Sequence, residues 1–395
     1  MFHKPVIVSM ARTAVGNLGE SLKPLDTIQL GTVAAKEALR RAGIEDGNVD
    51  EVVLGCVGQF GVTAFLARMV SLNAGIRETA TAQNVNRMCA SGLQAIITGS
   101  MLIEAGDADT VLAGGAESMS NYPYMLNGAR WGMRMGVGLN MLEDALTTAL
   151  CEPLSGPNQH ICITAENIAK KFGFTREQLD AYALEGHRRA LHAIAEGYFK
   201  EEIVPVTVKE RKKEYVFDMD EHPRETSMEK LAKLRPLLGP DHVVTAGNAS
   251  GVNDAAACLV LMSEEHAAEL GLKPIARVVD YAVAGVDPAY MGLGPIAATR
   301  KLMQRTGYTI DDFDVIELNE AFASPALACI QELGADPERV NPNGSGIALG
   351  HPLGATGAII TVKLLSELRR RGGRLGLASL CIGGGQGMSA AFELI

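Results

Sequence analysis

The sequence is short of positive charge and of paired cysteines. Its 36 lysines and arginines are outnumbered by 46 aspartates and glutamates, and the net charge of −10 argues against a general nucleic-acid binder. The seven cysteines form no CxxC pair and show no metal-ligand spacing with the eight histidines. We therefore expect reduced thiols, no bound metal, no nucleic-acid partner and a cytoplasmic location.

The chain also lacks segments that direct proteins into or across membranes. Its opening residues, MFHKPVIVSMART, contain no apolar core of a signal peptide, and its C-terminal FELI is not a peroxisomal address. The uncharged stretch 340–362 is interrupted by five glycines and two prolines, which makes it a poor membrane span. We expect a soluble chain without a membrane span.

What the sequence has instead is length and an alternating α/β pattern. A chain of 395 residues exceeds what one hydrophobic core usually supports, so two or three domains are expected. Apolar strands are predicted at 6–10, 49–57 and 109–116, and helices are predicted over 26–42 and 90–105. This alternation indicates a parallel or mixed sheet with crossover helices.

The region 120–251 interrupts this pattern and is interpreted as an insertion. It begins with a loop rich in glycine and methionine that runs to about Leu150. A capping-box signal, TREQ at 175–178, predicts the start of a helix, and the charged stretch from Lys209 onward predicts a surface hairpin and loop. The α/β pattern then returns with a predicted strand at 254–263.

The following segments repeat the first half of the chain. Residues 30–55 resemble residues 294–319, because in both a helix is followed by a glycine, an acidic loop and an apolar strand. A candidate catalytic residue then precedes an apolar helix in each half, Cys89 in the first and His351 in the second. This internal duplication predicts two similar α/β halves that face each other and bring Cys89 and His351 to a shared centre.

Four residues in these motifs suit nucleophilic chemistry. Cys89 lies where a helix N-terminus is expected, and such a position lowers the pKa of a thiol. His351, fixed between a glycine-rich turn and a proline, can act as a general base. Cys381 precedes three glycines whose N–H groups can approach a ligand closely. Asn319, directly after a predicted strand, can hold a water or orient a histidine.

Each of these residues also has a structural interpretation. A free cysteine is often a small core residue, which applies to Cys89 and more strongly to Cys381. His351 can be a histidine packed in its turn. Asn319 can cap a helix.

Together the motifs resemble those of the thiolase family, in the family's order and over essentially the whole chain. VNRMCASGLQA resembles the nucleophile motif, and NEAF, NPNGSGIALGHPLGATG and CIGGGQG resemble the three later motifs. The resemblance implies an α/β fold with five αβαβα layers, built from two duplicated halves with an inserted loop domain. The implied domains are an N-terminal half (1–119 plus 252–273), a loop domain (120–251) with coenzyme A and oligomer contacts, and a C-terminal half (274–395).

The resemblance also implies a role for each reactive residue. Cys89, activated by His351, would take the acyl group from an acyl-CoA, and Cys381 would remove the α-proton of a second acetyl-CoA. Asn319, through a water, and His351 would form one oxyanion hole. The N–H groups of Cys89 and of Gly383 or a near neighbour would form the other. No metal or cofactor is implied, since coenzyme A thioesters are the substrates.

Six further residues resemble family positions that contact the substrate. They are the coenzyme A contacts His160, Arg224 and Ser250, and the acyl-pocket residues Met291, Ala321 and Phe322. Arg224 has the alternative interpretation of a solvated loop charge. Three departures leave the chain-length preference open: Ile161 where short-chain members often carry methionine, Ser345 in place of a glycine, and the unusual segment CEPLSGPNQ at 151–159.

With this resemblance, the sequence predicts an acyltransferase that reversibly condenses two acetyl-CoA to acetoacetyl-CoA and coenzyme A through an acyl-cysteine. The alternative is a degradative 3-ketoacyl-CoA thiolase of broader chain length, acting in fatty acid β-oxidation. Remote alternatives are a Cys–His–Asn peptidase built from Cys89, His351 and Asn319, and a non-catalytic scaffold of the same fold. The resemblance also implies a homotetramer arranged as a dimer of dimers.

Overall fold

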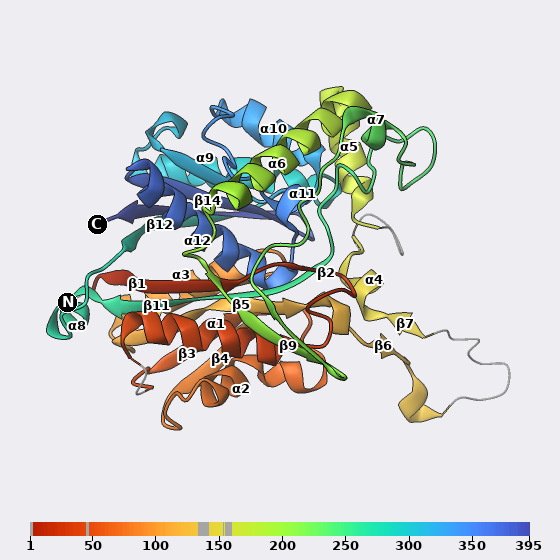
Figure 1. Cartoon of the computed structure of the whole chain (residues 1–395). Helices are drawn as coiled ribbons and strands as arrows, with labels where there is room; N and C mark the ends of the chain where they lie inside the picture. The colour runs from red at the N-terminus through yellow and green to blue at the C-terminus, as the bar shows by residue number, and fades with distance from the viewer. Residues whose placement is uncertain (1–2, 45–46, 133–141, 153, 155–159) are drawn as a thin grey trace.

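The computed structural model describes residues 3–44, 47–132, 142–152, 154 and 160–395 (Figure 1). The predicted loop rich in glycine and methionine and the segment CEPLSGPNQ therefore lie partly outside the described residues.

Most strands belong to one path of hydrogen-bonded neighbours, in the order β13-β14-β15-β12-β1-β11-β5-β3-β4. Their bounds are β1 (Pro5–Thr13), β3 (Glu51–Gly55), β4 (Thr81–Val85), β5 (Thr110–Ser118), β11 (Asn253–Ser263), β12 (Ala276–Gly285), β13 (Val315–Leu318), β14 (Leu375–Ile382) and β15 (Gln386–Leu394). The path consists of two half-sheets, which meet where β1 pairs with β12 at Val6–Arg277 and Ile7–Ala276.

The two half-sheets share one strand order, which confirms the predicted duplication. In the first, β1-β11-β5-β3-β4, the successive pairings are antiparallel, antiparallel, parallel and parallel. In the second, β12-β15-β14-β13, they are antiparallel, antiparallel and parallel. A parallel bridge from Ile316 to Val340 occupies the place that β4 has in the first half. Parallel neighbours need crossover connections, which explains the helices between these strands.

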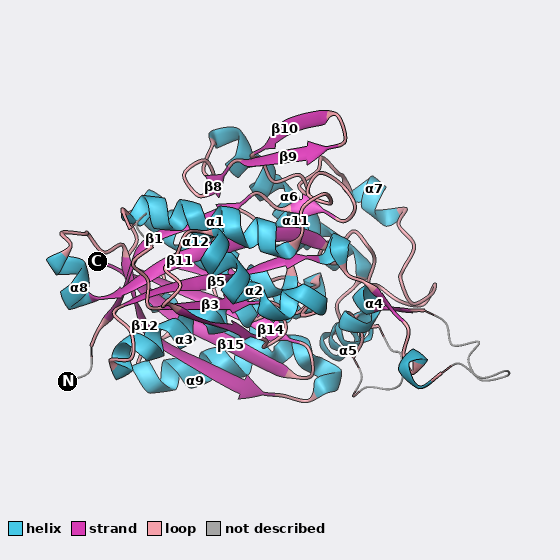
Figure 2. Cartoon of the chain, turned by 90° about the horizontal axis from the view of Figure 1, so that it is seen from below, coloured by secondary structure: helices cyan, strands magenta, loops and turns pink. Residues whose placement is uncertain are grey.

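Helices form layers outside and between the half-sheets (Figures 1 and 2). The outer face of the first half is covered by α1 (Thr27–Ala42) and α2 (Leu66–Asn73), and that of the second by α9 (Gly294–Thr306) and α10 (Ala323–Leu333). Figure 2 shows strands between α1 on one side and α9 on the other. The central layer consists of α3 (Ser91–Ala105) and α12 (Leu353–Arg371). This is the predicted five-layered αβαβα fold.

The limits of α1 follow directly from its sequence. The side chain of Asp26 accepts a hydrogen bond from the N–H of Gln29, whose own side chain accepts one from the N–H of Asp26. This capping box satisfies two N–H groups that the helix leaves open. The helix ends at Ala42, and the capping residue after it, Gly43, has a left-handed φ of 70°.

The central helix α3 is apolar because it is buried. Within the described residues, Met88–Ala105 is the one helical stretch long and apolar enough to cross a membrane by length and composition, and 61% of it is buried. It packs against β3, β5 and α12. Its composition is therefore that of a core helix.

The first turn of α3 and the first two turns of α12 touch through their backbones. A Cβ atom on Gly92 would lie 2.7 Å from the backbone nitrogen of Ala358, and one on Gly357 would lie 2.2 Å from that of Leu93. Both distances are too short for a carbon atom, so glycine is required on both helices. Because the contact lies near both N-termini, the residues that precede the two helices are brought together.

The region 120–251 consists of shorter elements that pack over both halves. They are β6 (Tyr124–Met125), β7 (Glu143–Asp144), α4 (Ala145–Ala149), α5 (Cys162–Phe172), α6 (Arg176–Glu196), β8 (Ile203–Val204), β9 (Val206–Glu210), β10 (Lys213–Phe217) and α7 (Met228–Ala232). The predicted capping box opens α6 at Thr175, and the predicted hairpin is β9–β10. The proposed limits of the three domains stay a prediction.

A buried ion pair on α12 gives a stability prediction. Lys363 Nζ donates hydrogen bonds to Glu317 Oε2 at 2.8 Å and to the carbonyl of Gly344 at 2.6 Å, and both charged side chains are buried. Removing one charge leaves the other unpaired, so Lys363→Met should lower the free energy of unfolding by about 3–5 kcal/mol. Denaturant titration measures this change.

The exposed pair of Arg300 with Glu332 provides the matched control. Arg300→Met should change the free energy of unfolding by less than about 1 kcal/mol. The double variant Lys363→Met, Glu317→Leu should recover much of the loss, because no buried charge remains. Equal losses of unfolding free energy for Lys363→Met and Arg300→Met would contradict the larger stability effect expected for the buried pair.

Candidate active site

The first reactive cysteine lies in a tight turn before α3. Met88 has a left-handed φ of 45°, which is uncommon for a residue other than glycine. Ser91 Oγ accepts a hydrogen bond from the N–H of Arg87 at 2.9 Å and donates one to the carbonyl of Met88 at 2.7 Å. These bonds fix the chain on both sides of Cys89, which is 5% exposed.

The Cys89 thiol is neutral at pH 7. Burial raises its pKa to about 11, although the N–H groups of Gly383 and of Cys89 itself act in the opposite direction. The expectation of a lowered pKa is therefore wrong, because the loss of water outweighs the stabilisation at the helix N-terminus. The structure nevertheless brings the two predicted N–H donors to the sulfur. The thiol needs a base to become a nucleophile.

His351 lies between α11 (Gly346–Leu349) and α12 and is 4% exposed. Its Nδ1 is 2.6 Å from Thr356 Oγ1, and that hydroxyl donates its hydrogen to the carbonyl of Pro352 at 2.8 Å. Nδ1 must then carry the imidazole proton, which leaves a lone pair on Nε2. Asn319 Nδ2 lies 3.3 Å from Nε2. Burial lowers the pKa of His351 to about 4, so it is a neutral base at pH 7.

Asn319 is held at the end of β13 by a rigid, buried turn. Its N–H donates to the carbonyl of Ser379 at 2.8 Å. The carboxylate of the following residue, Glu320, accepts hydrogen bonds from the Tyr182 hydroxyl at 2.7 Å and from Asn341 Nδ2 at 2.8 Å. Glu320 therefore braces the turn, and the amide of Asn319 is left to face His351.

Cys381 lies at the end of β14 and is 2% exposed. Burial and the nearby Cys89 hold the pKa of its thiol well above the usual range, whereas the N–H of Ala321 acts to lower it. The two thiols are thus neighbours, as the sequence predicts.

Around Cys381 lies a cluster of buried apolar side chains that forms one wall of the site. It contains all three predicted acyl-pocket residues, and its members are Cys162, Ala165, Val244, Ala249, Met291, Ala321, Phe322 and Cys381, with Ile161 and Leu238 packed against them. Residues from the insertion and from the second half therefore build this wall together.

Glu117 is a site residue that the sequence analysis missed. Its buried carboxylate accepts hydrogen bonds from the N–H groups of Val57 at 2.9 Å, Gly58 at 3.0 Å and Gly354 at 2.8 Å. Burial raises the pKa of this carboxyl. Glu117 ties the first half to the turn after His351. The available signal was an acidic residue at the end of the apolar run TVLAGGAES.

This fold and site can be compared with those of known proteins. Residues 5–265 match the family model described as thiolase, N-terminal domain, and residues 272–394 match thiolase, C-terminal domain. The chain belongs to the thiolase family.

Two curated relatives cover the whole of this thiolase. The acetyl-CoA acetyltransferase of Syntrophomonas wolfei is 48% identical and the beta-ketothiolase BktB of Cupriavidus necator is 50% identical, each over 398 residues and 100% of both chains. A solved Bacillus anthracis acetyl-CoA acetyltransferase has a TM-score of 0.97 at 47% identity, covering 100% of this chain and 99% of that one. Human mitochondrial 3-ketoacyl-CoA thiolase has a TM-score of 0.96 at 39% identity, with the same coverage.

The predicted coenzyme A contacts of this thiolase fall into two places. Ser250 donates its N–H to the carbonyl of Ala321 at 2.9 Å, and the exposed His160 accepts the N–H of Cys162 on Nδ1 at 3.2 Å, so both border the apolar cluster around Cys381. Arg224 is exposed on the loop after β10. All three substrate contacts stay predictions.

The described residues contain no group of three or more His, Cys, Asp or Glu side chains that could hold a metal ion. The predicted absence of a metal and of a cofactor stays a prediction.

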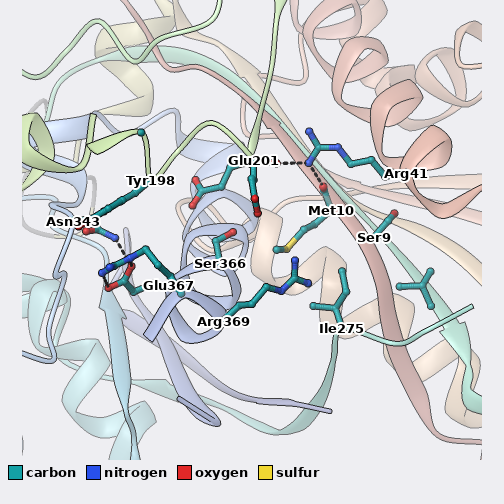
Figure 3. Close-up of a pocket in the computed structure, with 14 residues that line it drawn as sticks. Ser9, Met10, Arg41, Tyr198, Glu201, Ile275, Asn343, Ser366, Glu367 and Arg369 are labelled. Atoms are coloured by element: carbon teal, nitrogen blue, oxygen red, sulfur yellow. Dashed lines mark hydrogen bonds and ion pairs between the residues drawn. The ribbon is translucent and has the colours of Figure 1, made fainter. Parts of the chain in front are cut away.

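A separate cavity of about 570 Å³ lies at the other end of α12 (Figure 3). Its lining includes Met10 on β1, Glu201 before β8, and Ser366 and Arg369 on α12. At about 1.5 Å per helical residue, Ser366 lies roughly 20 Å along α12 from the helix start beside His351. This cavity is therefore remote from the two thiols.

The buried histidine gives a pH prediction. Because burial lowers the pKa of His351 from 6.5 to about 4, its imidazole should stay unprotonated where an exposed histidine titrates. Protonation removes the base, so the acylation rate of Cys89 should show no loss around pH 6.5 from this group and should fall as the pH approaches 4. NMR titration of histidine-labelled protein, with His351→Asn to assign the resonance, measures the midpoint directly. A midpoint near 6.5 would contradict this account.

Proposed function

We propose that this thiolase reversibly condenses two acetyl-CoA to acetoacetyl-CoA and coenzyme A through an acetyl group on Cys89. The observation that carries the proposal is a buried pair of neighbouring thiols, Cys89 and Cys381, with the N–H of Gly383 directed at Cys89. Leu353, two residues after the neutral His351, packs in the same buried cluster as Cys89. The relatives named acetyl-CoA acetyltransferase support the choice of substrate.

In the first half-reaction the sulfur of Cys89 attacks the thioester carbonyl of acetyl-CoA. The thiol is neutral, so its proton moves to Nε2 of His351 as the new bond forms. The N–H groups of Cys89 and Gly383 meet the negative charge that develops on the carbonyl oxygen, and one such donor is typically worth about 10²–10³-fold in rate. The coenzyme A sulfur leaves with the proton from His351.

In the second half-reaction Cys381 acts as the base. The Cys381 thiol first passes its proton to His351, which is neutral again after coenzyme A has left. The resulting thiolate is strongly basic, because burial raises the pKa of Cys381, and it removes the α-proton of a second acetyl-CoA. The enolate oxygen is stabilised by His351 and by Asn319 through a water, and the α-carbon attacks the acetyl group on Cys89. Cys89 leaves as a thiolate and takes up the proton held by His351, while Cys381 keeps the α-proton, so all three groups are again neutral and the cycle is complete. Neither step requires a metal, because the thioester already acidifies the α-carbon.

A degradative role on long chains is less supported. The solved 3-ketoacyl-CoA thiolase has a lower identity to this chain than the relatives named acetyl-CoA acetyltransferase. The side chain of Ile161 lies close to Gly383, whose N–H is directed at Cys89, since a Cβ atom on Gly383 would lie 3.8 Å from Ile161 Cδ1. Ile161 therefore occupies space beside the group that would carry the acyl chain. Thiolysis rates on acetoacetyl-CoA and on longer 3-ketoacyl-CoA thioesters separate the two roles, and equal or faster cleavage of the long chains would reverse the assignment.

The proposal extends to a cytoplasmic homotetramer with a role in fatty acid metabolism. Support for assembly comes from large apolar side chains on the surface, among them Val62, Phe65 and Trp131, which are 67%, 66% and 85% exposed. Exposed apolar patches commonly mark protein–protein contacts.

The covalent intermediate gives the main functional prediction. After mixing with acetyl-CoA, mass spectrometry of the intact protein and of its peptides should find one acetyl group on Cys89. The Cys89→Ser variant should lose this adduct. An adduct that survives Cys89→Ser would refute the assignment of the nucleophile.

A second variant separates the two half-reactions. Cys381→Ala removes the proposed base but leaves Cys89, His351 and the N–H donors in place, so it should still form the acetyl adduct. It should then lose condensation by several orders of magnitude. Unimpaired condensation by Cys381→Ala would exclude Cys381 as the base.

A further inference from the structure

The side chain of Asn253 contacts the backbone of the turn that carries His351. Asn253 is the first residue of β11 and is completely buried. Its Oδ1 accepts a hydrogen bond from the N–H of His351 at 3.0 Å, and its Nδ2 donates one to the carbonyl of Gly16 at 3.0 Å. The amide has one orientation, since exchanging its O and N would set donor against donor and acceptor against acceptor.

The start of β11, where Asn253 lies, is held in place by its neighbours. β2 (Gly16–Asn17) pairs with the start of β11. The N–H of Asn17 donates to Glu221 Oε1 at 2.6 Å, and Asn17 Oδ1 lies 2.6 Å from Nδ1 of His222 and 3.4 Å from Nδ2 of Asn253. The side-chain amide of Asn253 therefore links the backbone of His351 to β2, which belongs to the first half and is hydrogen-bonded to Glu221 and His222 of the insertion.

The turn before His351 is shaped around this amide. Gly350 has a φ of +100°, and a Cβ atom there would lie 2.4 Å from Cγ and 2.5 Å from Oδ1 of Asn253. Any larger residue at position 350 would overlap the Asn253 side chain, so the N–H of His351 can approach Asn253 Oδ1 this closely only because residue 350 is glycine. On the other side of His351, Pro352 restricts the backbone.

We propose that Asn253 is a positioning residue that sets the place of the His351 imidazole relative to the Cys89 thiol. The inference rests on the proposed function in one respect, that His351 is the base for Cys89. Thr356 fixes the rotation of the ring from Nδ1, whereas Asn253 fixes the backbone from which the ring projects. Catalytic groups misplaced by about 1 Å can lose about 10²-fold in rate, so Asn253→Ala should slow His351-dependent reactions of Cys89 by about 10- to 100-fold.

Alkylation of Cys89 by iodoacetamide tests this without any acyl-CoA. The rate is followed by mass spectrometry of the Cys89 peptide from pH 5 to pH 9 for a double-mutant cycle of Asn253→Ala and His351→Ala. Asn253→Ala should slow alkylation about 10- to 100-fold when His351 is present and change it little in the His351→Ala background. An equal loss in both backgrounds, or no loss in either, would overturn the proposal.

Asn248 offers a matched control in the same segment of chain. It is also completely buried, but its Nδ2 donates to Asp180 Oδ1 at 2.9 Å and to the carbonyl of Val243 at 3.0 Å. Asn248→Ala should therefore lower stability and leave the pH profile of Cys89 alkylation in place. A profile changed by Asn248→Ala as much as by Asn253→Ala would assign both residues a merely structural role.

The isosteric variant Asn253→Asp keeps the test open if Asn253→Ala does not fold. Its carboxyl still accepts the N–H of His351 and, when protonated, can donate to the carbonyl of Gly16, but the ionised form cannot. Its alkylation deficit relative to the wild type should therefore grow as the pH rises. A rate equal to that of the wild type at every pH would overturn the proposal.

The substrate assignment is tested separately by acetylation of the wild type. If acetyl-CoA leaves no adduct on Cys89 but the alkylation cycle shows coupling, the positioning role stands and the proposed substrate falls. If the adduct forms but the cycle shows no coupling, only the positioning role falls.

Discussion

The site depends on the backbone contact between α3 and α12. A side chain on Gly92 or Gly357 would separate the two helices, because its first carbon would overlap backbone atoms of the facing helix. The contact lies in the first turn of α3 and close to that of α12, so the segments before these helices converge. One segment carries Cys89 and the other carries His351. The duplicated halves each supply a strand, a turn and a helix, and the reactive residues lie where the two copies meet.

The same packing explains the electrostatics of the site. Burial raises the pKa of Cys89 to about 11 and lowers that of His351 to about 4, and both shifts favour the uncharged form. The resting pair is therefore thiol and imidazole. In such a site the charge appears when substrate arrives, and the N–H groups of Cys89 and Gly383 already lie at the Cys89 sulfur. Preorganised donors in a water-poor site stabilise that charge more than bulk water does.

Sequence patterns single out the candidate reactive residues because each lies in a local motif. Cys89 and His351 precede apolar helices, and the duplication predicts that they meet. Two contacts that hold these residues escape such reasoning. Glu117 bonds to Gly354, 237 positions later, and Asn253 bonds to His351, 98 positions later. The pKa of Cys89 was mispredicted for the same reason: a helix N-terminus is visible in the sequence, whereas the burial that outweighs it comes from distant segments.

The position of the insertion accounts for what local motifs leave undetermined. The chain leaves the first half after β5 and returns at β11, and these strands are neighbours that pair at Ser118–Asp254. Because the ends of the inserted segment are already held together by the sheet, a long segment can be accommodated at little cost in loop entropy. Both ends of the insertion leave these two strands on the side of the half-sheet that carries the site.

The returning end places Asn253 against the backbone of His351 and Ser250 against Ala321 of the apolar cluster around Cys381. The inserted helix α5 supplies further residues of that cluster. The reactive groups thus belong to the duplicated core, whereas half of the apolar cluster around Cys381 comes from the insertion, namely Cys162, Ala165, Val244 and Ala249. Chain-length preference can therefore change with the insertion while the chemistry stays the same, which is why motifs in the core predict the reaction and leave the length of the acyl group open.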